Sequence, residues 1–72
     1  MGLTKFERAV RAAESKADDA TRLCESAWAH ADAMTMRYGV DSPQVKTALE
    51  TAYAMQDARD AAHAEVRRML NA

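Results

Sequence analysis

The sequence predicts an all-α protein, an antiparallel two-helix hairpin. Three observations predict this fold. The 72-residue chain contains a single internal cluster of helix-breaking residues, at residues 39–43. On both sides of that cluster, apolar residues recur at alternating steps of three and four, the spacing of a coiled-coil seam. The link between the two regular stretches is short, and helices joined by two to five residues favour antiparallel packing.

The first helix is expected over residues 4–38. Thr4, followed three residues later by Glu7, has the spacing of a capping box, in which side chains satisfy free N–H groups of the first turn. No glycine or proline follows until Gly39. Small seam residues let two helix axes approach more closely than usual. Every seam position is apolar, and alanine fills most of its middle: Leu3, Phe6, Val10, Ala13, Ala17, Ala20, Cys24, Ala27, Ala31, Met34 and Tyr38.

The turn is expected over residues 39–42. Gly39 accepts the left-handed conformation that ends many helices. Either Asp41 or Ser42 can cap the helix that follows. Pro43 suits the first turn of that helix, where its missing N–H has no helical partner. A helix end and a helix start are therefore encoded within five residues.

The second helix is expected over residues 43–70, in a single domain that spans residues 1–72. Arg59 interrupts its seam, and we expect the neighbouring Ala58 to take the inward position. The seam positions that keep the spacing are Val45, Ala48, Ala52, Met55, Ala62, Val66 and Met69.

The hairpin is expected to pair with a second copy into a four-helix bundle. Seventeen of the 72 residues are alanine, and a chain of this length buries only about 60% of its unfolded surface. Folding the chain about Val40 places Trp28 beside Tyr53 and leaves the first residues without a counterpart. Several large apolar side chains therefore stay uncovered in one hairpin. The interface predicted from them comprises Leu3, Phe6, Leu23, Trp28, Met36 and Tyr53.

Residues that carry catalytic chemistry in other proteins are isolated in this chain. Cys24 lies on the seam, where a buried, unreactive thiol is expected. His30 and His63 lie on different helices without the spacing of a zinc site, and the fold places His63 near Asp18 and Asp19. Surface ion pairs are therefore expected for the histidines. Phosphate-binding loops and catalytic motifs are absent. We expect no enzyme activity, no cofactor and no metal site.

Charge and hydropathy predict a cytoplasmic protein. The formal net charge is -1, and no apolar run approaches the ~18 residues that span a bilayer. The first residues lack the apolar stretch of a signal peptide. A single cysteine suits a reducing compartment. We expect no membrane association.

The charge is unevenly distributed along the hairpin. Residues 1–16 and 59–72 carry seven basic and four acidic side chains, whereas residues 17–58 carry three basic and seven acidic ones. The open end is therefore basic and the turn end acidic. This polarity predicts either docking against the acidic end of an antiparallel partner or binding of nucleic-acid phosphates. The candidate phosphate contacts are Lys5, Arg8, Arg11, Arg67 and Arg68.

Residues 24–32, Cys-Glu-Ser-Ala-Trp-Ala-His-Ala-Asp, are similar to a Cys-Glu-Ser…His-Ala-Asp run in the Rop family of plasmid copy-number regulators. Members of that family are helical hairpins that dimerise and bind paired RNA hairpins. The run lies in the first helix here and in the second helix there, so no functional residue is carried over. The favoured function is a protein–protein interaction or scaffolding module that acts through self-association. A small nucleic-acid-associated regulator is the alternative.

Overall fold

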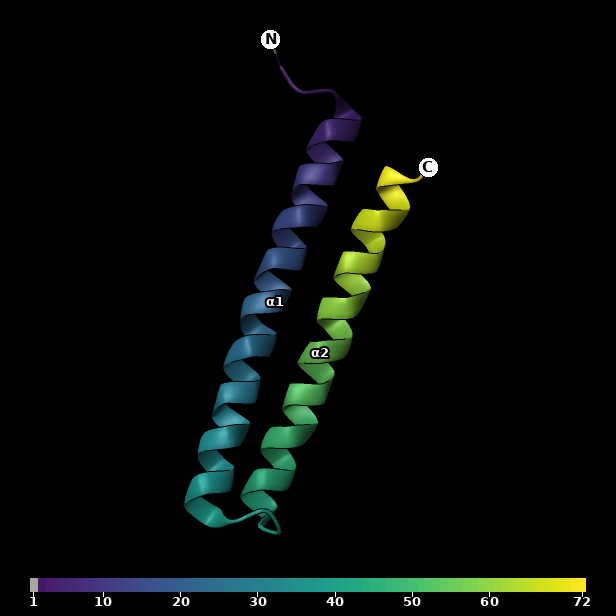
Figure 1. Ribbon diagram of the computed structural model, residues 1–72. Helices are drawn as coiled ribbons and strands as arrows, with labels where there is room; N and C mark the ends of the chain where they lie inside the picture. The colour runs from purple at the N-terminus through teal and green to yellow at the C-terminus, as the bar shows by residue number, and fades with distance from the viewer. Residues whose placement is uncertain (1) are drawn as a thin grey trace.

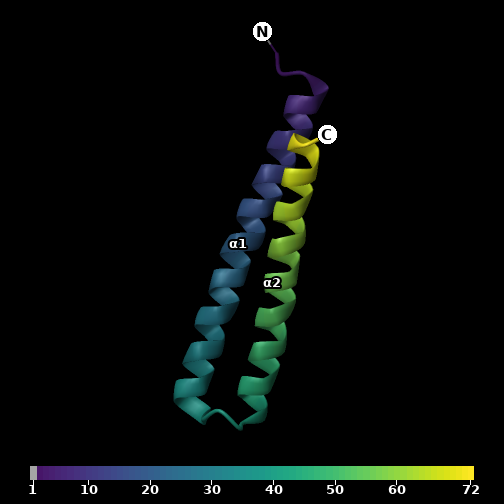
Figure 2. The ribbon, with the colours of Figure 1, turned by 45° about the vertical axis from the view of Figure 1, so that its right-hand side comes forward.

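The computed structural model describes residues 2–72 as two α-helices joined by a short turn. Helix α1 spans Lys5–Tyr38 and helix α2 spans Pro43–Leu70. Figures 1 and 2 show the helices side by side, with the turn at one end and both termini at the other. The prediction of an all-α antiparallel hairpin is therefore confirmed.

Local side-chain and backbone chemistry sets the helix ends. Thr4 Oγ1 accepts a hydrogen bond from the N–H of Glu7 at 3.0 Å, and the Glu7 carboxylate accepts one from the N–H of Thr4, which completes the predicted capping box. Of the two candidates for the second cap, Ser42 has the role, because its Oγ accepts from the N–H of Val45. Gly39 ends α1 with φ of +86°, a backbone conformation that disfavours any residue with a Cβ.

Small side chains make the contact between the helices. The buried residues of α1 are spaced by exact heptads, so one row of the predicted seam lies directly against α2. The other row is only half-buried between Ala13 and Met34, so it is turned toward one side of the hairpin. The buried residues of both helices are Val10, Ala17, Cys24, Ala31, Val45, Ala48 and Ala52.

The molecule is a single layer of helices. It extends over 54 Å along the helices but only 11 Å in its thinnest direction. Such a layer has two broad faces, and within residues 2–72 no further element covers either of them. The first turns of α1 also extend beyond the end of α2 (Figure 1). Leu3 is half-buried before α1 begins, and Phe6 is exposed.

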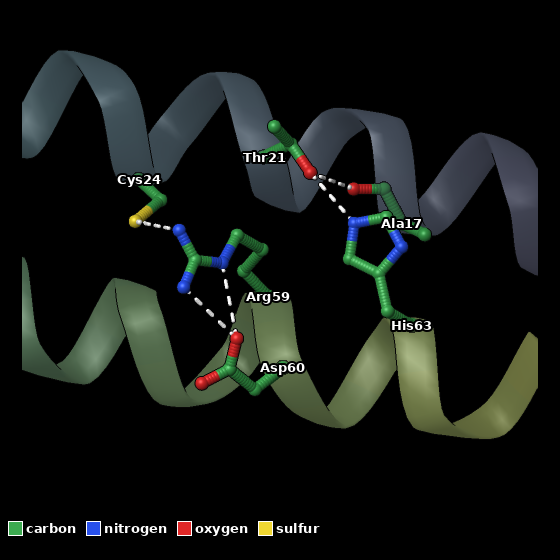
Figure 3. Close-up of polar contacts among 6 residues, drawn as sticks. All are labelled: Ala17, Thr21, Cys24, Arg59, Asp60 and His63. Atoms are coloured by element: carbon green, nitrogen blue, oxygen red, sulfur yellow. Dashed lines mark hydrogen bonds and ion pairs between the residues drawn. The ribbon is translucent and has the colours of Figure 1, made fainter.

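The prediction that Ala58 replaces Arg59 in the seam is wrong. Ala58 is exposed, whereas Arg59 is half-buried and points from α2 toward α1 (Figure 3). The physical reason is the apolar stem of arginine, which can cover a seam while its charged end reaches polar partners. The three- and four-residue spacing of α2 is therefore kept through this position.

Candidate interaction surfaces

The two broad faces of the hairpin carry different side chains. We call one the closed face, because side chains of the two helices meet across it; it carries Thr21, Trp28, Tyr53 and His63. We call the other the groove face. Its floor consists of the half-buried seam row and the α2 residues opposite that row. The groove face comprises Ala13, Lys16, Ala20, Leu23, Ala27, His30, Met34, Ala48, Thr51, Met55, Ala58, Ala62 and Glu65.

An aromatic pair joins the helices on the closed face. The rings of Trp28 and Tyr53 lie 5.1 Å apart at 84°, an edge-to-face arrangement. Such pairs contribute about 0.5–1.5 kcal/mol beyond the area that they bury. The predicted proximity of these two residues is confirmed, and it places their contact within one hairpin.

A histidine contact lies next to this pair on the closed face. Thr21 Oγ1 donates to the carbonyl of Ala17 at 2.9 Å and lies 2.9 Å from Nε2 of His63 (Figure 3). Because the single hydroxyl proton goes to the carbonyl, Nε2 of His63 is the donor to Thr21. The predicted ion pair of His63 with Asp18 or Asp19 is wrong. The Asp18 and Asp19 side chains are exposed on α1, whereas Thr21 is half-buried. Thr21 is therefore the residue that contacts His63.

The buried cysteine is in contact with a guanidinium group. Arg59 Nη1 lies 3.7 Å from Sγ of Cys24, and Nε and Nη2 of the same side chain donate to Asp60 at 3.1 and 3.0 Å (Figure 3). The hydrogen bond to Asp60 raises the pKa of Arg59, so this group remains charged. A guanidinium cannot accept a proton. Cys24 is therefore buried, as predicted, beside a group that cannot act as its base.

Arg59 is expected to stabilise the hairpin mainly through its stem. Replacement by alanine will lower the free energy of unfolding by about 1 kcal/mol, because it uncovers the seam. Replacement by methionine will retain most of that free energy, since methionine restores the length without the charge. Urea unfolding followed by circular dichroism measures both. Equal losses in the two variants would instead assign the stability to the polar contacts of the guanidinium.

Two shallow hollows lie along the groove face. One, of about 650 Å³, is near the turn and is lined by residues that include Ala27, His30 and Met34. The other, of about 500 Å³, is nearer the open end and includes Ala13 in its lining. Leu23 lies four residues before Ala27, so it shares their face of α1. Its side chain is 58% exposed, so a large apolar group stands between the two hollows.

Opposite charges lie on the two edges of the groove face. Lys16 on α1 and Glu65 on α2 line the same hollow. The hydrogen bond from Arg68 lowers the pKa of Glu65, and the charge of Lys16 acts in the same direction. Glu65 is therefore an anion at neutral pH, at the edge opposite a lysine.

The predicted interface residues within the helices occupy three separate places. Leu23 and Phe6 lie on the groove-face side of α1, in line with the half-buried row or beside it. Trp28 and Tyr53 contact each other on the closed face. Met36 is 89% exposed and lies away from the contact between the two helices. The structure thus does not combine them into one surface. The groove itself was not predicted, although the half-buried residues at its base belong to the predicted seam.

The predicted phosphate contacts are all exposed at the open end, but acidic residues lie among them. Arg68 forms an ion pair with Glu65. Arg11 lines a small hollow together with Glu7 and Glu14. The full set is Lys5, Arg8, Arg11, Arg67 and Arg68. These side chains form no continuous basic patch free of carboxylates.

No protein-family model, curated protein or solved structure matches this chain. Within residues 2–72, no group of three or more histidine, cysteine, aspartate or glutamate side chains is placed to hold a metal ion. Neither helix is long and apolar enough to cross a membrane.

Proposed function

We propose that this protein is a protein–protein interaction module that self-associates through its groove face, so that two hairpins form a four-helix bundle. The contrast between the faces supports this proposal most directly. The closed face carries contacts between the two helices, those of Trp28 with Tyr53 and of Thr21 with His63. The groove face has an apolar floor and two hollows that side chains of one hairpin leave unfilled.

The small core of one hairpin also supports association. Four of its seven buried residues are alanine, and each buried alanine removes little apolar surface from water. Chains of this size usually need an additional source of stability, and oligomerisation is one of the common sources. A second hairpin on the groove face would bury residues such as Leu23, Met34 and Met55. Association therefore supplies the second layer of helices that a single hairpin lacks.

Sedimentation equilibrium tests the proposal. At micromolar concentration we expect a mass of twice the 7.9 kDa of the chain. Circular dichroism on the same samples should show that helicity rises with the fraction of dimer, because folding and association support each other. A mass of 7.9 kDa throughout the micromolar range would contradict self-association.

The nucleic-acid alternative is tested by a mobility-shift experiment with random DNA and RNA at low salt. We expect no shift, because carboxylates such as Glu7 and Glu65 lie among the basic side chains of the open end. A shift that disappears when Arg8 and Arg67 are changed to glutamate would favour the regulator over the interaction module.

A further inference from the structure

We infer that the two copies associate with their turns at the same end of the bundle, so that α1 of each copy lies over α2 of the other. This inference rests on the proposed self-association and adds the orientation of the partner. It follows from the two edges of the groove face, which are complementary to each other in size and in charge.

The register assigns each edge residue a counterpart at the same level. Trp28 on α1 contacts Tyr53 on α2. Because the helices are antiparallel, each step toward the N-terminus on α1 matches one step toward the C-terminus on α2. Leu23 is therefore level with Ala58. The same register pairs Lys16 with Glu65 and His30 with Thr51, and each of these pairs lines one hollow.

A symmetric dimer allows two ways to lay one groove face on another. A two-fold axis parallel to the helices exchanges α1 and α2 and keeps every residue at its level, so both turns lie at one end. An axis perpendicular to the helices places α1 on α1 and α2 on α2 with the levels reversed, so the turns lie at opposite ends. The residues that meet at the edges differ between the two arrangements.

The arrangement with both turns at one end matches unlike side chains. Leu23 meets the exposed Ala58 of the second copy, so a large side chain lies against a small one, as in close-packed interiors. Lys16 meets Glu65 of the second copy, which joins opposite charges. Symmetry makes each of these contacts twice. The edges of one chain therefore supply both halves of a complementary interface.

The reversed arrangement matches like with like. Leu23, near the middle of the hairpin, would meet Leu23 of the second copy, and Ala58 would lie near Ala58 and leave a gap. Lys16 would lie near the level of His30, and Glu65 near that of Thr51. The ion pair between Lys16 and Glu65 would then be lost. The crowding of two Leu23 side chains and the gap between two Ala58 side chains would both occur in the same interface.

The charge difference between the two ends of the hairpin favours the reversed arrangement, but carboxylates that contribute to it lie outside the groove. Glu25 and Asp32 lie at three and four residues from Trp28, on the closed-face side of α1. These carboxylates are exposed. Charges separated by more than about 8 Å in solvent are largely screened at physiological ionic strength. Contacts within the groove therefore decide the orientation.

Cross-linking of introduced cysteines tests the orientation. In a Cys24→Ala background, Asp41→Cys places one thiol in the turn and Asn71→Cys places one at the open end of a separate chain. The two chains are mixed, equilibrated and treated with a short bismaleimide. We expect links between two Asp41→Cys chains and between two Asn71→Cys chains, and no link between the two kinds of chain, because like ends are adjacent.

The outcomes separate this inference from the proposed function. A dimer mass with links between Asp41→Cys and Asn71→Cys chains would overturn the orientation and leave self-association intact, as would a dimer mass without any link. A monomer mass would overturn both. The Cys24→Ala replacement removes the native thiol, so that only the introduced cysteines can react. Alanine suits this position because most of the buried residues of the hairpin are alanines.

A charge exchange provides a second readout. Lys16→Glu and Glu65→Lys are each expected to weaken self-association about tenfold, because each places like charges together twice. Mixing the two variants should restore assembly as a heterodimer, since each residue 16 then faces an opposite charge at residue 65. Failure of the mixture to regain the wild-type association constant would overturn the inferred contact.

Discussion

Replacing Ala52 with leucine will remove a large part of the free energy of unfolding of the hairpin and lower its melting temperature. Ala52 is fully buried between the helices, at 0% exposure. Three additional carbons at this point must push the helix axes apart, and overpacking of this kind costs about 1–3 kcal/mol or more. A core of this size rarely supplies more than about 3–5 kcal/mol, so the loss is a large part of the total. Thermal unfolding followed by circular dichroism measures the effect.

Ala64→Leu is the matched control for this substitution. Ala64 is exposed on the same helix, so leucine there adds the same atoms and nearly the same helix propensity without entering the seam. Its melting temperature should stay close to that of the wild type. Similar melting temperatures for the two variants would show that the helices are not held at the close separation that alanine permits.

Leu23→Arg is expected to dissociate the proposed dimer into single hairpins. The substitution places a charge at the middle of the groove face, where an apolar side chain is expected to enter the second copy. A charge without a partner at the centre of an interface typically costs more than 2 kcal/mol, which corresponds to a dissociation constant raised by more than about thirtyfold. Sedimentation velocity over a range of concentrations measures this change.

Met36→Arg adds the same charge on the same helix and serves as the control. Met36 is 89% exposed and lies outside both faces, so its replacement should leave the dissociation constant unchanged. If Met36→Arg dissociates the dimer and Leu23→Arg does not, the interface lies on the outer side of α1 and the groove face is not the site of association.

Local signals in the sequence were sufficient to predict the helices and the turn. The Thr4–Glu7 capping box and the end of α1 at Gly39 depend on residues within one turn of the helix end. The buried heptad row also follows directly from spacing, because a coiled-coil seam is a property of one helix. These features need no knowledge of the opposite helix.

The difference between the two faces could not be predicted, because it depends on both helices together. Apolar residues flank the buried row of α1 on both sides, with Ala27 on one and Trp28 on the other. The face that becomes closed is set by contacts across the pair, such as that of Trp28 with Tyr53. The contact of His63 with Thr21 was missed because the register gives only the residue level with His63, which is Asp18, whereas the histidine side chain bonds to a residue about one turn away along α1.

The alanine seam also determines how the protein responds to temperature. Alanine loses no side-chain rotamers on burial, so the seam forms at a low cost in conformational entropy. It also hides little apolar surface, and the heat-capacity change of unfolding grows with the apolar surface that unfolding exposes. The free energy of one hairpin should therefore depend only weakly on temperature. In the proposed dimer a second copy would cover the exposed Leu23 and the half-buried Met34 and Met55, so association would add to the heat-capacity change. We therefore expect cooling to weaken the proposed assembly more than it weakens the hairpin itself.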